Sequence, residues 1–489
     1  MLLFHEFQNI KKMQNKIYFI LILFMLLGIN NINAQDPMGL YYMNTIPQSS
    51  HLNPAIQPRA HSYVSLVSVS EYLKSDAAFK NLIQENGKQW LLPIHQDYSY
   101  SKLKKATGKS LDLANTLDVE LIGFGFRVGQ NYFSLNTKVK TYVNVGVPYD
   151  LLSIGEKGFP NNKNFNLSPL KANGITYVET SLGFSREIDE RLTLGIKVKP
   201  LIGLVAANTK TENFDLYTSR DYWRADYTGS IDVSGPVDFS ITKEEDTGKY
   251  SFDFELYEEN EIKEHLTTFD NLGIAFDLGA NYQLTNRWSV SASLIDLGSI
   301  KWQITRAYDF KFDYTFDGIE GEGIIEDFED EIDKITNELE EAFTHTERFG
   351  KYSTRLAPEL YVGTQYEITP YFNLSLLSRN IFYKDNFRQD FNIGANFQPY
   401  SFMSANINYS IRPRGGNGLG TVLMFLLGPL QFYTALDYIP TTYSDLYESN
   451  NEERIAIMFP NARNINFKVG LNLIFNRHGY KDRPMLYKY

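Results

Sequence analysis

The connections between segments of alternating apolar and polar residues constrain this chain more than any other feature. Segments of roughly 9–15 residues follow one another from about residue 60 to residue 475. Six connections are short: Gly129-Gln130, Ile188–Arg191, Thr285–Arg287, Thr369-Pro370, Gln398–Ser401 and Gly428-Pro429. Those between them are mostly longer: 71–116, 145–175, 207–271, 298–352, 384–387, 412–418 and 439–464. Tight turns on one side and large loops on the other are typical of a closed antiparallel barrel in an outer membrane.

The side chains within each segment divide into an apolar and a polar face. In residues 133–145, one parity is mostly apolar, whereas the other carries serine, asparagine and lysine. The same division recurs at 192–198, 274–282, 391–397 and 467–475. A soluble sandwich also alternates and is the alternative, but its polar face is often dense in charge. Here that face is rich in Gly, Ser, Asn and Thr, so we expect the apolar side chains to face lipid and the polar ones to line a lumen.

Six short turns join twelve strands, and two further segments complete the predicted sheet. His61–Ser70 and Ile465–Phe475 raise the count to fourteen, and an even count places both ends of the barrel on the periplasmic side. The region 207–271 contains two more strand-like stretches, Asp226–Val233 and Tyr250–Tyr257. They predict either an external hairpin or an extra pair of strands, so sixteen strands is the alternative.

The first 34 residues are typical of a secretory signal. Lysines at 11, 12 and 16 precede the apolar run Ile17–Ile29, and the small residue Ala34 follows a short polar stretch. The run is shorter than the roughly 20 residues that a spanning helix needs. We therefore expect export to the outer membrane, with four parts of the chain: signal 1–34, N-terminal periplasmic or plug segment 35–60, barrel 61–475 and periplasmic tail 476–489.

Composition excludes several classes of protein. A mean hydropathy of −0.31 is incompatible with a bundle of membrane helices, but not with strands in which only alternate residues are apolar. The absence of cysteine excludes disulfides, thiolate metal sites and cysteine nucleophiles. A net charge of −11 argues against a nucleic-acid partner. The seven histidines lack metal-ligand spacing and no nucleophile elbow occurs, so we expect no metal, cofactor or catalysis.

The long connections predict some structure of their own. Residues 320–348 are acidic, and apolar residues recur there at helical spacing: Ile324, Phe328, Ile332, Ile335, Leu339 and Phe343. This helix is either a lid or docking surface for a partner protein, or a solvated helix packed on its own loop. Residues 71–115 are also expected to be partly helical. Besides such partners, we expect contacts with outer-membrane lipid and lipopolysaccharide.

One set of charged residues falls on the inward parity of neighbouring strands: Arg127, Lys138, Lys140, Lys197 and Lys199. Charged residues at membrane depth face the interior and often mark a path or a ligand. This basic cluster is predicted either to bind a carboxylate or another anionic head group, or to form an internal salt network with Glu179 and Asp277.

The tripeptide Asn53-Pro54-Ala55, just before the first strand, resembles a motif of the long-chain fatty-acid transporter superfamily and of related type IX secretion barrels. Three further stretches resemble a Bacteroidota branch of that superfamily with no assigned function: Trp288–Trp302, Leu427–Asp437 and Asn464–Phe475. The resemblance implies a fourteen-stranded barrel whose N-terminal segment enters or plugs the lumen.

These observations together predict a non-enzymatic transport or channel barrel for a hydrophobic or amphipathic solute. Asn53, Pro54 and Ala55 would form the plug hinge, because Pro54 lacks a donor and restricts Asn53 to extended conformations. The acidic insert and the tail after the last strand depart from the transporter pattern. The alternative is therefore a structural or accessory subunit of an outer-membrane secretion or surface assembly.

Overall fold

The computed structural model describes residues 36–477, except 83, 87–88, 92–97, 108, 244–249, 257–269, 305, 318–337, 339–341, 384–386, 413–416, 440–442, 449–454 and 461–462. The predicted signal, most of the predicted acidic helix and the tail beyond residue 477 lie outside the described residues.

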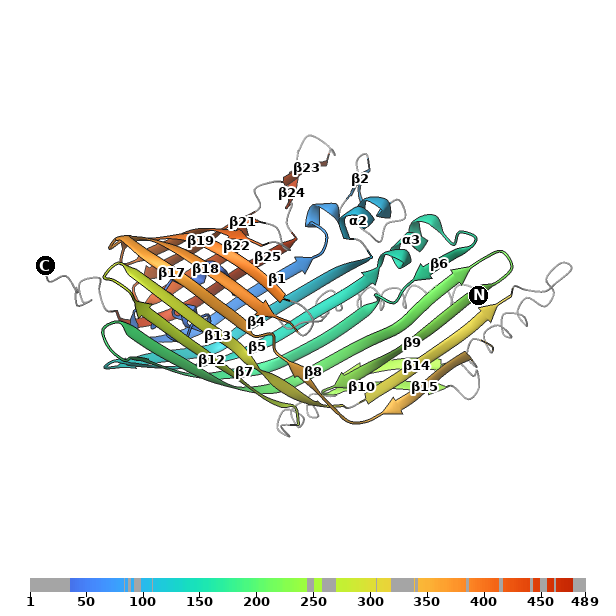
Figure 1. Ribbon diagram of the computed structural model, residues 1–489, viewed down its shortest axis with the longest axis horizontal. Helices are drawn as coiled ribbons and strands as arrows, with labels where there is room; N and C mark the ends of the chain where they lie inside the picture. Colours follow the sequence, from blue (N-terminus) through green and yellow to red (C-terminus); the bar gives the residue numbers. More distant parts are fainter. Residues whose placement is uncertain are drawn as a thin grey trace, which may run out of the picture.

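Fourteen antiparallel strands close into a barrel, which confirms the predicted fold (Figure 1). They are β1 (Ala60–Ser75), β4 (Ser110–Val128), β5 (Asn131–Pro148), β7 (Lys171–Glu187), β8 (Leu192–Thr218), β12 (Leu272–Gln283), β13 (Trp288–Gln303), β17 (Glu359–Thr369), β18 (Phe372–Phe382), β19 (Phe387–Tyr400), β20 (Met403–Ile411), β21 (Gly418–Leu427), β22 (Leu430–Ile439) and β25 (Asn464–Arg477). The barrel is closed because β1 pairs with β4 on one side and with β25 on the other.

The six predicted short turns all lie at one end of the barrel, here called the turn end, and the long connections lie at the loop end (Figure 1). Gly129 and Gly428 begin the turns β4–β5 and β21–β22, with φ of 60° and 61°. The commonest two-residue hairpin turns have this left-handed backbone, which glycine adopts without steric cost.

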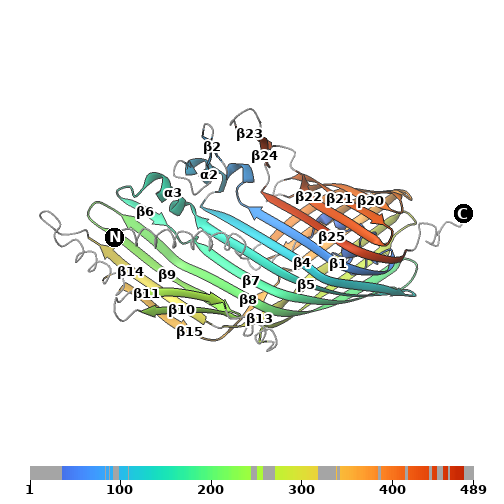
Figure 2. The ribbon, with the colours of Figure 1, turned by 180° about the vertical axis from the view of Figure 1, so that it is seen from behind.

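Part of the sheet continues past the barrel as a flat extension at the loop end (Figures 1 and 2). Strand β8, with 27 residues, belongs to both the wall and the extension. The other strands that lengthen the sheet are β6 (Lys163–Asn166), β9 (Trp223–Ser234), β14 (Arg306–Phe316), β15 (Phe343–Arg348) and β16 (Lys351–Arg355).

Two sequence predictions are corrected here. The stretch Asp226–Val233 lies in β9, and Tyr250–Leu256 forms β11, a hairpin with β10 (Val237–Lys243); neither enters the barrel, so sixteen strands is wrong. Residues 343–348, placed at the end of the predicted helix, form strand β15 instead. Phe343 lies opposite Phe312 of β14, so pairing with a neighbouring strand overrides the helical spacing.

The remaining connections carry short elements beside the loop end. These are the helices α2 (Tyr100–Thr107), α3 (Tyr149–Lys157) and η3 (Phe79–Asn81), and the hairpins β2–β3 (Gln84–Asn86, Gln89–Leu91) and β23–β24 (Tyr443–Glu448, Ile455–Pro460). Helix α2 confirms the prediction that residues 71–115 are partly helical. Within the described ranges, no helix is long and apolar enough to cross a membrane.

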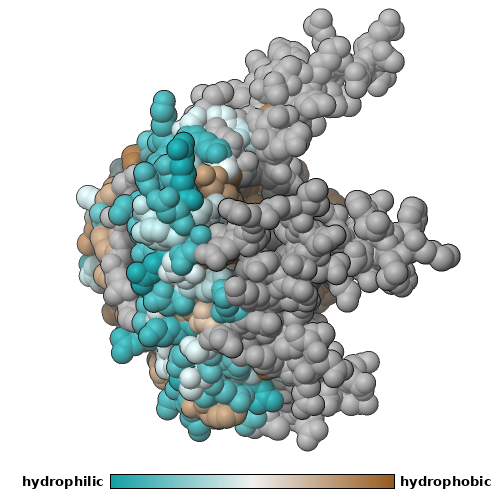
Figure 3. Space-filling view, turned by 90° about the vertical axis from the view of Figure 1, so that its right-hand side faces the viewer, coloured by the Kyte–Doolittle hydropathy of each residue, from teal (hydrophilic) through white to brown (hydrophobic). Residues whose placement is uncertain are grey.

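The wall of the barrel is apolar outside and polar inside. On β12, for example, Ile274 and Leu278 are about half exposed on the outer face, whereas Asp277 between them is fully buried. Viewed from the loop end, much of the described surface is hydrophilic (Figure 3). The barrel is thus of the outer-membrane type, with its polar side chains in the interior.

Candidate functional site in the barrel lumen

The N-terminal segment, residues 36–59, lies inside the barrel (Figures 1 and 2). It contains two short 3-10 helices, η1 (Met38–Leu40) and η2 (Pro47–His51), and almost all of its side chains are buried. Pro47 begins η2, a position at which the missing N–H of proline costs no hydrogen bond.

The segment packs on one side against apolar side chains of the wall. Met38, Leu40, Met43 and Ile46 form a buried cluster with inward-facing residues of β17, β18, β21 and β22: Tyr361, Leu377, Val422, Met424, Tyr433 and Ala435. Tyr41 stacks on Tyr361 with ring centroids 5.5 Å apart. Polar contacts fix the segment's position within this cluster, since Gln431 donates to the carbonyl of Thr45 at 2.9 Å.

The motif Asn53-Pro54-Ala55 forms a tight turn against the opposite wall. The Asn53 side-chain oxygen accepts the backbone N–H of Ala55 at 2.9 Å, and its amide donates to the Tyr41 hydroxyl at 2.9 Å. This local bond closes an Asx turn, which asparagine favours. Gly195 of β8 and Gly279 of β12, which pair with each other, face the motif. A Cβ on either glycine would overlap its atoms, so the two glycines form the notch that receives it.

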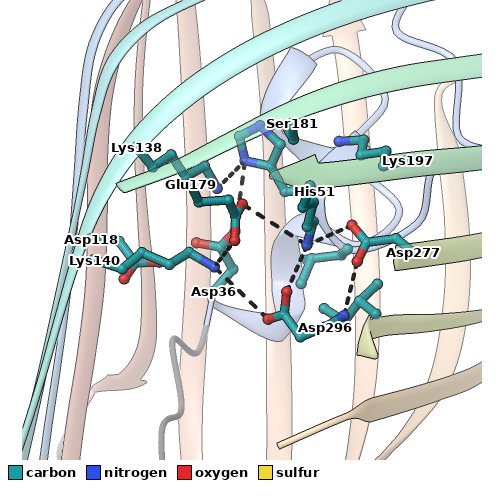
Figure 4. Close-up of a pocket in the computed structure, with 13 residues that line it drawn as sticks. Asp36, His51, Asp118, Lys138, Lys140, Glu179, Ser181, Lys197, Asp277 and Asp296 are labelled. Atoms are coloured by element: carbon teal, nitrogen blue, oxygen red, sulfur yellow. Dashed lines mark hydrogen bonds and ion pairs between the residues drawn. The ribbon is translucent and has the colours of Figure 1, made fainter. Parts of the chain in front are cut away.

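Four of the five predicted basic residues gather beside His51 of η2, and Figure 4 labels three of them, Lys138, Lys140 and Lys197. Lys138 and Lys140 come from β5, and Lys197 and Lys199 from β8, and each is at most about 5% exposed. Lys140 lies 2.8 Å from Glu179 of β7, and Lys199 lies 2.6 Å from Asp277 of β12. Glu179 and Asp277, the two carboxylates predicted for an internal salt network, therefore both pair with lysines of the cluster.

Arg127, the fifth predicted residue, lies apart from these lysines near the turn end. Its guanidinium donates to the Pro58 carbonyl at 3.1 Å and to Gln57, pairs with Glu187 at 3.2 Å, and lies 5.5 Å from the ring of Tyr132. It therefore ties the exit of the N-terminal segment to the turn between β4 and β5.

A third carboxylate, Asp296, reaches the lysines through an irregularity that the sequence analysis missed. Ile295 and Asp296 of β13 stand opposite the single residue Asp277, which is a β-bulge. Asp296 has φ of 59°, a left-handed conformation that is uncommon outside glycine and clusters at functional sites. The bulge turns the carboxylate inward, 2.6 Å from Lys199 and 3.8 Å from Lys140. In the sequence, the alternation of apolar and polar residues breaks at Ile295-Asp296, and this break could have predicted the bulge.

The other two lysines, together with Lys468 of β25, contact the N-terminal segment instead. Lys138 donates to His51 Nδ1 at 2.9 Å, Lys197 lies 3.5 Å from Ser50 Oγ, and Lys468 lies 2.5 Å from Asp36. Among the described residues, no carboxylate lies within ion-pair distance of Lys138 or Lys197.

His51 is neutral in this arrangement. Because an ammonium group only donates, His51 Nδ1 must accept from Lys138, which leaves the ring proton on Nε2, 3.8 Å from Glu120. Burial, and next the charge of Lys138, hold the pKa of His51 well below its usual range. The charged groups around the ring enclose a cavity of ≈ 20 Å³, which is room for about one water molecule.

A second charged layer, also missed from the sequence, lies inside the barrel at the loop end. Arg379 and Arg388 bond Asp390 at 2.6 and 3.0 Å, and Arg412 bonds Asp437 at 2.7 Å. The four residues that lie in strands have the same inward parity as the lysines, so the parity rule could have found them. Among the described residues, no cluster of three or more acidic or histidine side chains is arranged to hold a metal ion.

Comparison with known proteins gives a family but no activity. The sequence model of a family of unknown function, DUF5723, matches residues 54–437. No curated protein matches the chain in sequence. Among solved structures, the Ralstonia pickettii toluene transporter TbuX is similar at 11% identity and a TM-score of 0.43, over 88% of this chain and 95% of that one. A Pseudomonas aeruginosa FadL homologue is similar at 10% identity and a TM-score of 0.41, over 92% and 100%.

Proposed function

The chain belongs to this family of unknown function, as its sequence predicted, and we propose that it is an outer-membrane transport barrel for amphipathic solutes with an anionic head group. In this proposal the N-terminal segment is a plug that leaves the lumen for transport. The observation that carries the proposal is the two-sided lumen: one wall behind the segment is apolar and the other is charged.

The apolar wall would receive the tail of the solute. When the segment leaves, the side chains of β17, β18, β21 and β22 that pack against Met38, Leu40 and Ile46 lose their cover. An apolar wall exposed in a water-filled lumen has a free-energy cost of about 25 cal/mol per Å². A hydrocarbon tail offsets that cost, whereas a fully polar solute does not.

The charged wall would receive the head group. Lys138, Lys197 and Lys468 make their closest polar contacts with the segment, whereas Lys140 and Lys199 pair with wall carboxylates. Displacement of the segment therefore leaves three lysines without those contacts. A carboxylate on the solute would replace them with charge-assisted hydrogen bonds.

The motif Asn53-Pro54-Ala55 has the contacts that a hinge for this movement needs. Its turn is closed locally, by the bond from Ala55 to Asn53, so the motif can keep its shape as the segment moves. The glycine notch holds it by shape, through Gly195 and Gly279, without a covalent or ionic bond.

The apolar outer face of the wall supports placement in an outer membrane. Outward side chains such as Leu194, Ile196 and Ile393 are 40–53% exposed, and they belong to strands whose inner faces are polar. An apolar outer face around a polar interior is the arrangement that a barrel in lipid requires.

Removing the plug tests the proposal. We expect the full-length barrel in planar bilayers to conduct weakly, and a variant that lacks residues 37–56 to conduct steadily. In proteoliposomes, the full-length protein should take up a long-chain fatty acid, and Lys138→Met/Lys197→Met should slow that uptake. Replacing Lys210, an exposed lysine of the extension, with methionine is the control. A deletion variant that inserts as a folded barrel yet neither conducts nor takes up solute would defeat the proposal.

The extension favours a second candidate, a structural subunit of an outer-membrane assembly. Five additional strands extend the sheet beyond the wall, and their edges offer backbone groups with which a partner protein could pair. Absence of uptake, together with a partner that co-purifies in fixed ratio and is lost when the extension is shortened, would support this candidate.

A further inference from the structure

A row of small side chains crosses the outer face of the barrel. Ala280 of β12 pairs with Ala292 of β13, which pairs with Val362 of β17, and Val362 pairs with Ser378 of β18. The row ends at Phe391 of β19. In the adjoining rows, the same strands carry larger outward residues, among them Leu278, Leu294, Leu360, Tyr282 and Leu376.

The difference in side-chain size leaves a groove across the wall. Its volume is ≈ 490 Å³, and apart from Tyr282, Ser291, Thr364 and Ser378 its lining residues are apolar or glycine. Strands are about 4.8 Å apart, so the row from β12 to β19 is about 19 Å long. One leaflet of a bilayer has a hydrocarbon depth of about 15 Å, so the groove is long enough for an acyl chain that crosses one leaflet.

A polar trio lies at the loop-end corner of the groove, where the outward parity is otherwise apolar. The Asn380 amide donates to Ser378 Oγ at 3.2 Å, and Gln389 donates to the Asn380 side-chain oxygen at 2.9 Å. Beyond the trio, Phe382 and Phe387 are both about half exposed, with ring centroids 5.4 Å apart. Girdles of aromatic residues flank the apolar band of an outer-membrane barrel, which is consistent with a position of this pair near the border of the hydrocarbon layer.

We propose that this groove binds one acyl chain of an outer-leaflet lipid, whose ester or amide group hydrogen-bonds to the trio of Ser378, Asn380 and Gln389. The inference rests on the proposed function only for the placement of the barrel in the membrane. The position of the trio decides the leaflet, because it lies on the loop-end side of the groove. The row of small side chains indicates which molecule occupies the groove. A thin flexible chain fits between Leu278 and Leu376, and the hydrocarbon around a membrane protein fills an apolar groove on its surface.

Filling the groove tests this binding site. The full-length protein and Ala280→Leu/Ala292→Leu are extracted from native outer membranes and analysed by native mass spectrometry for retained lipid. We expect one lipid per wild-type barrel and about a tenfold smaller bound fraction in the filled variant. Ala395→Leu is the matched control, because Ala395 also faces outward but lies outside the groove, opposite Leu374 and Ile407. Gln389→Leu, which leaves the groove open, should also weaken retention.

Fluorescence supplies a second measurement. Trp288 faces outward and donates to Thr364 Oγ1 at 2.5 Å, at the border of the groove. A lipid with brominated acyl chains should quench Trp288 in the wild type, and less in Ala280→Leu/Ala292→Leu; Trp288→Phe identifies the signal. Any of three results would overturn the inference. They are equal lipid retention in Ala280→Leu/Ala292→Leu and Ala395→Leu, no retained lipid in the wild type, and a retained transmembrane protein in place of the lipid. Flotation with liposomes separates the two proposals: a barrel that floats but lacks the lipid defeats only the groove.

Discussion

Replacing Gly195 with alanine should drive the N-terminal segment out of the lumen. The added Cβ would overlap the backbone carbonyl of Pro54 and the backbone nitrogen of Ala55, and backbone atoms cannot rotate away as the end of a side chain can. Overpacking a buried site costs typically 1–3 kcal/mol. At about 2 kcal/mol, the population with the segment undocked rises about 30-fold, because 1.36 kcal/mol is tenfold.

Cysteine labelling measures that population without interference, because the chain has no native cysteine. Ser50→Cys places the only thiol on η2, at a residue that is about 6% exposed in the docked segment. A membrane-impermeant thiol reagent should therefore react slowly in the Ser50→Cys protein and about 30-fold faster when Gly195→Ala is added, since labelling requires undocking.

Gly394→Ala is the matched control. Gly394 also faces the lumen, but an added Cβ there would meet the side chains of Ser375 and Asn406 in the wall and not the N-terminal segment. Heat-modifiable migration of each variant shows that the barrel is folded. Equal labelling rates for Gly195→Ala and Gly394→Ala in folded barrels would refute the idea that the glycine notch holds the motif.

Three further predictions concern the contacts of the same segment. Because His51 is neutral when the segment is docked, docking of the segment should weaken as pH falls below about 6.5. The labelling rate of Ser50→Cys, divided by its rate in a His51→Gln background, should then rise by up to about tenfold per pH unit. A ratio of the two rates that does not change with pH would contradict this prediction. Lys199→Met leaves Asp277 and Asp296 without their closest cation and should destabilise the folded barrel by about 3–5 kcal/mol in denaturant unfolding, whereas an unchanged midpoint would show that these charges are solvated. Asn53→Ala removes the side-chain bonds to the Ala55 N–H and to the Tyr41 hydroxyl and should weaken docking by about 1 kcal/mol, measured as faster labelling of Ser50→Cys; a labelling rate equal to that of Ser50→Cys alone would contradict this.

The barrel was predictable because its signals are local. Each short turn and the alternation on either side of it lie within a few dozen residues, and the apolar outer face repeats the same parity on neighbouring strands. The positions of Lys138, Lys140, Lys197 and Lys199 followed from that parity, since neighbouring strands bring equal parities to one side.

What the sequence could not show depends on distant partners. Strand β9 alternates as the barrel strands do, so its sequence does not reveal that it pairs beyond the wall with β8 and β14. Phe343 fits both a helix and a strand, and only its pairing opposite Phe312 decides. Asp296 points inward because of a bulge opposite Asp277, and a bulge breaks the parity on which the prediction relied.

The length of β8 has a mechanical meaning. About 75 Å of strand backbone joins Gly195, against which Pro54 packs, to the far end of the extension at Thr218. The pairing of β8 has two irregularities, near Gly203 and near Thr211, at which the strand can bend while the hydrogen bonds on either side are kept. A force applied to the extension at Thr218 is therefore transmitted along the same strand that holds Pro54 in the lumen.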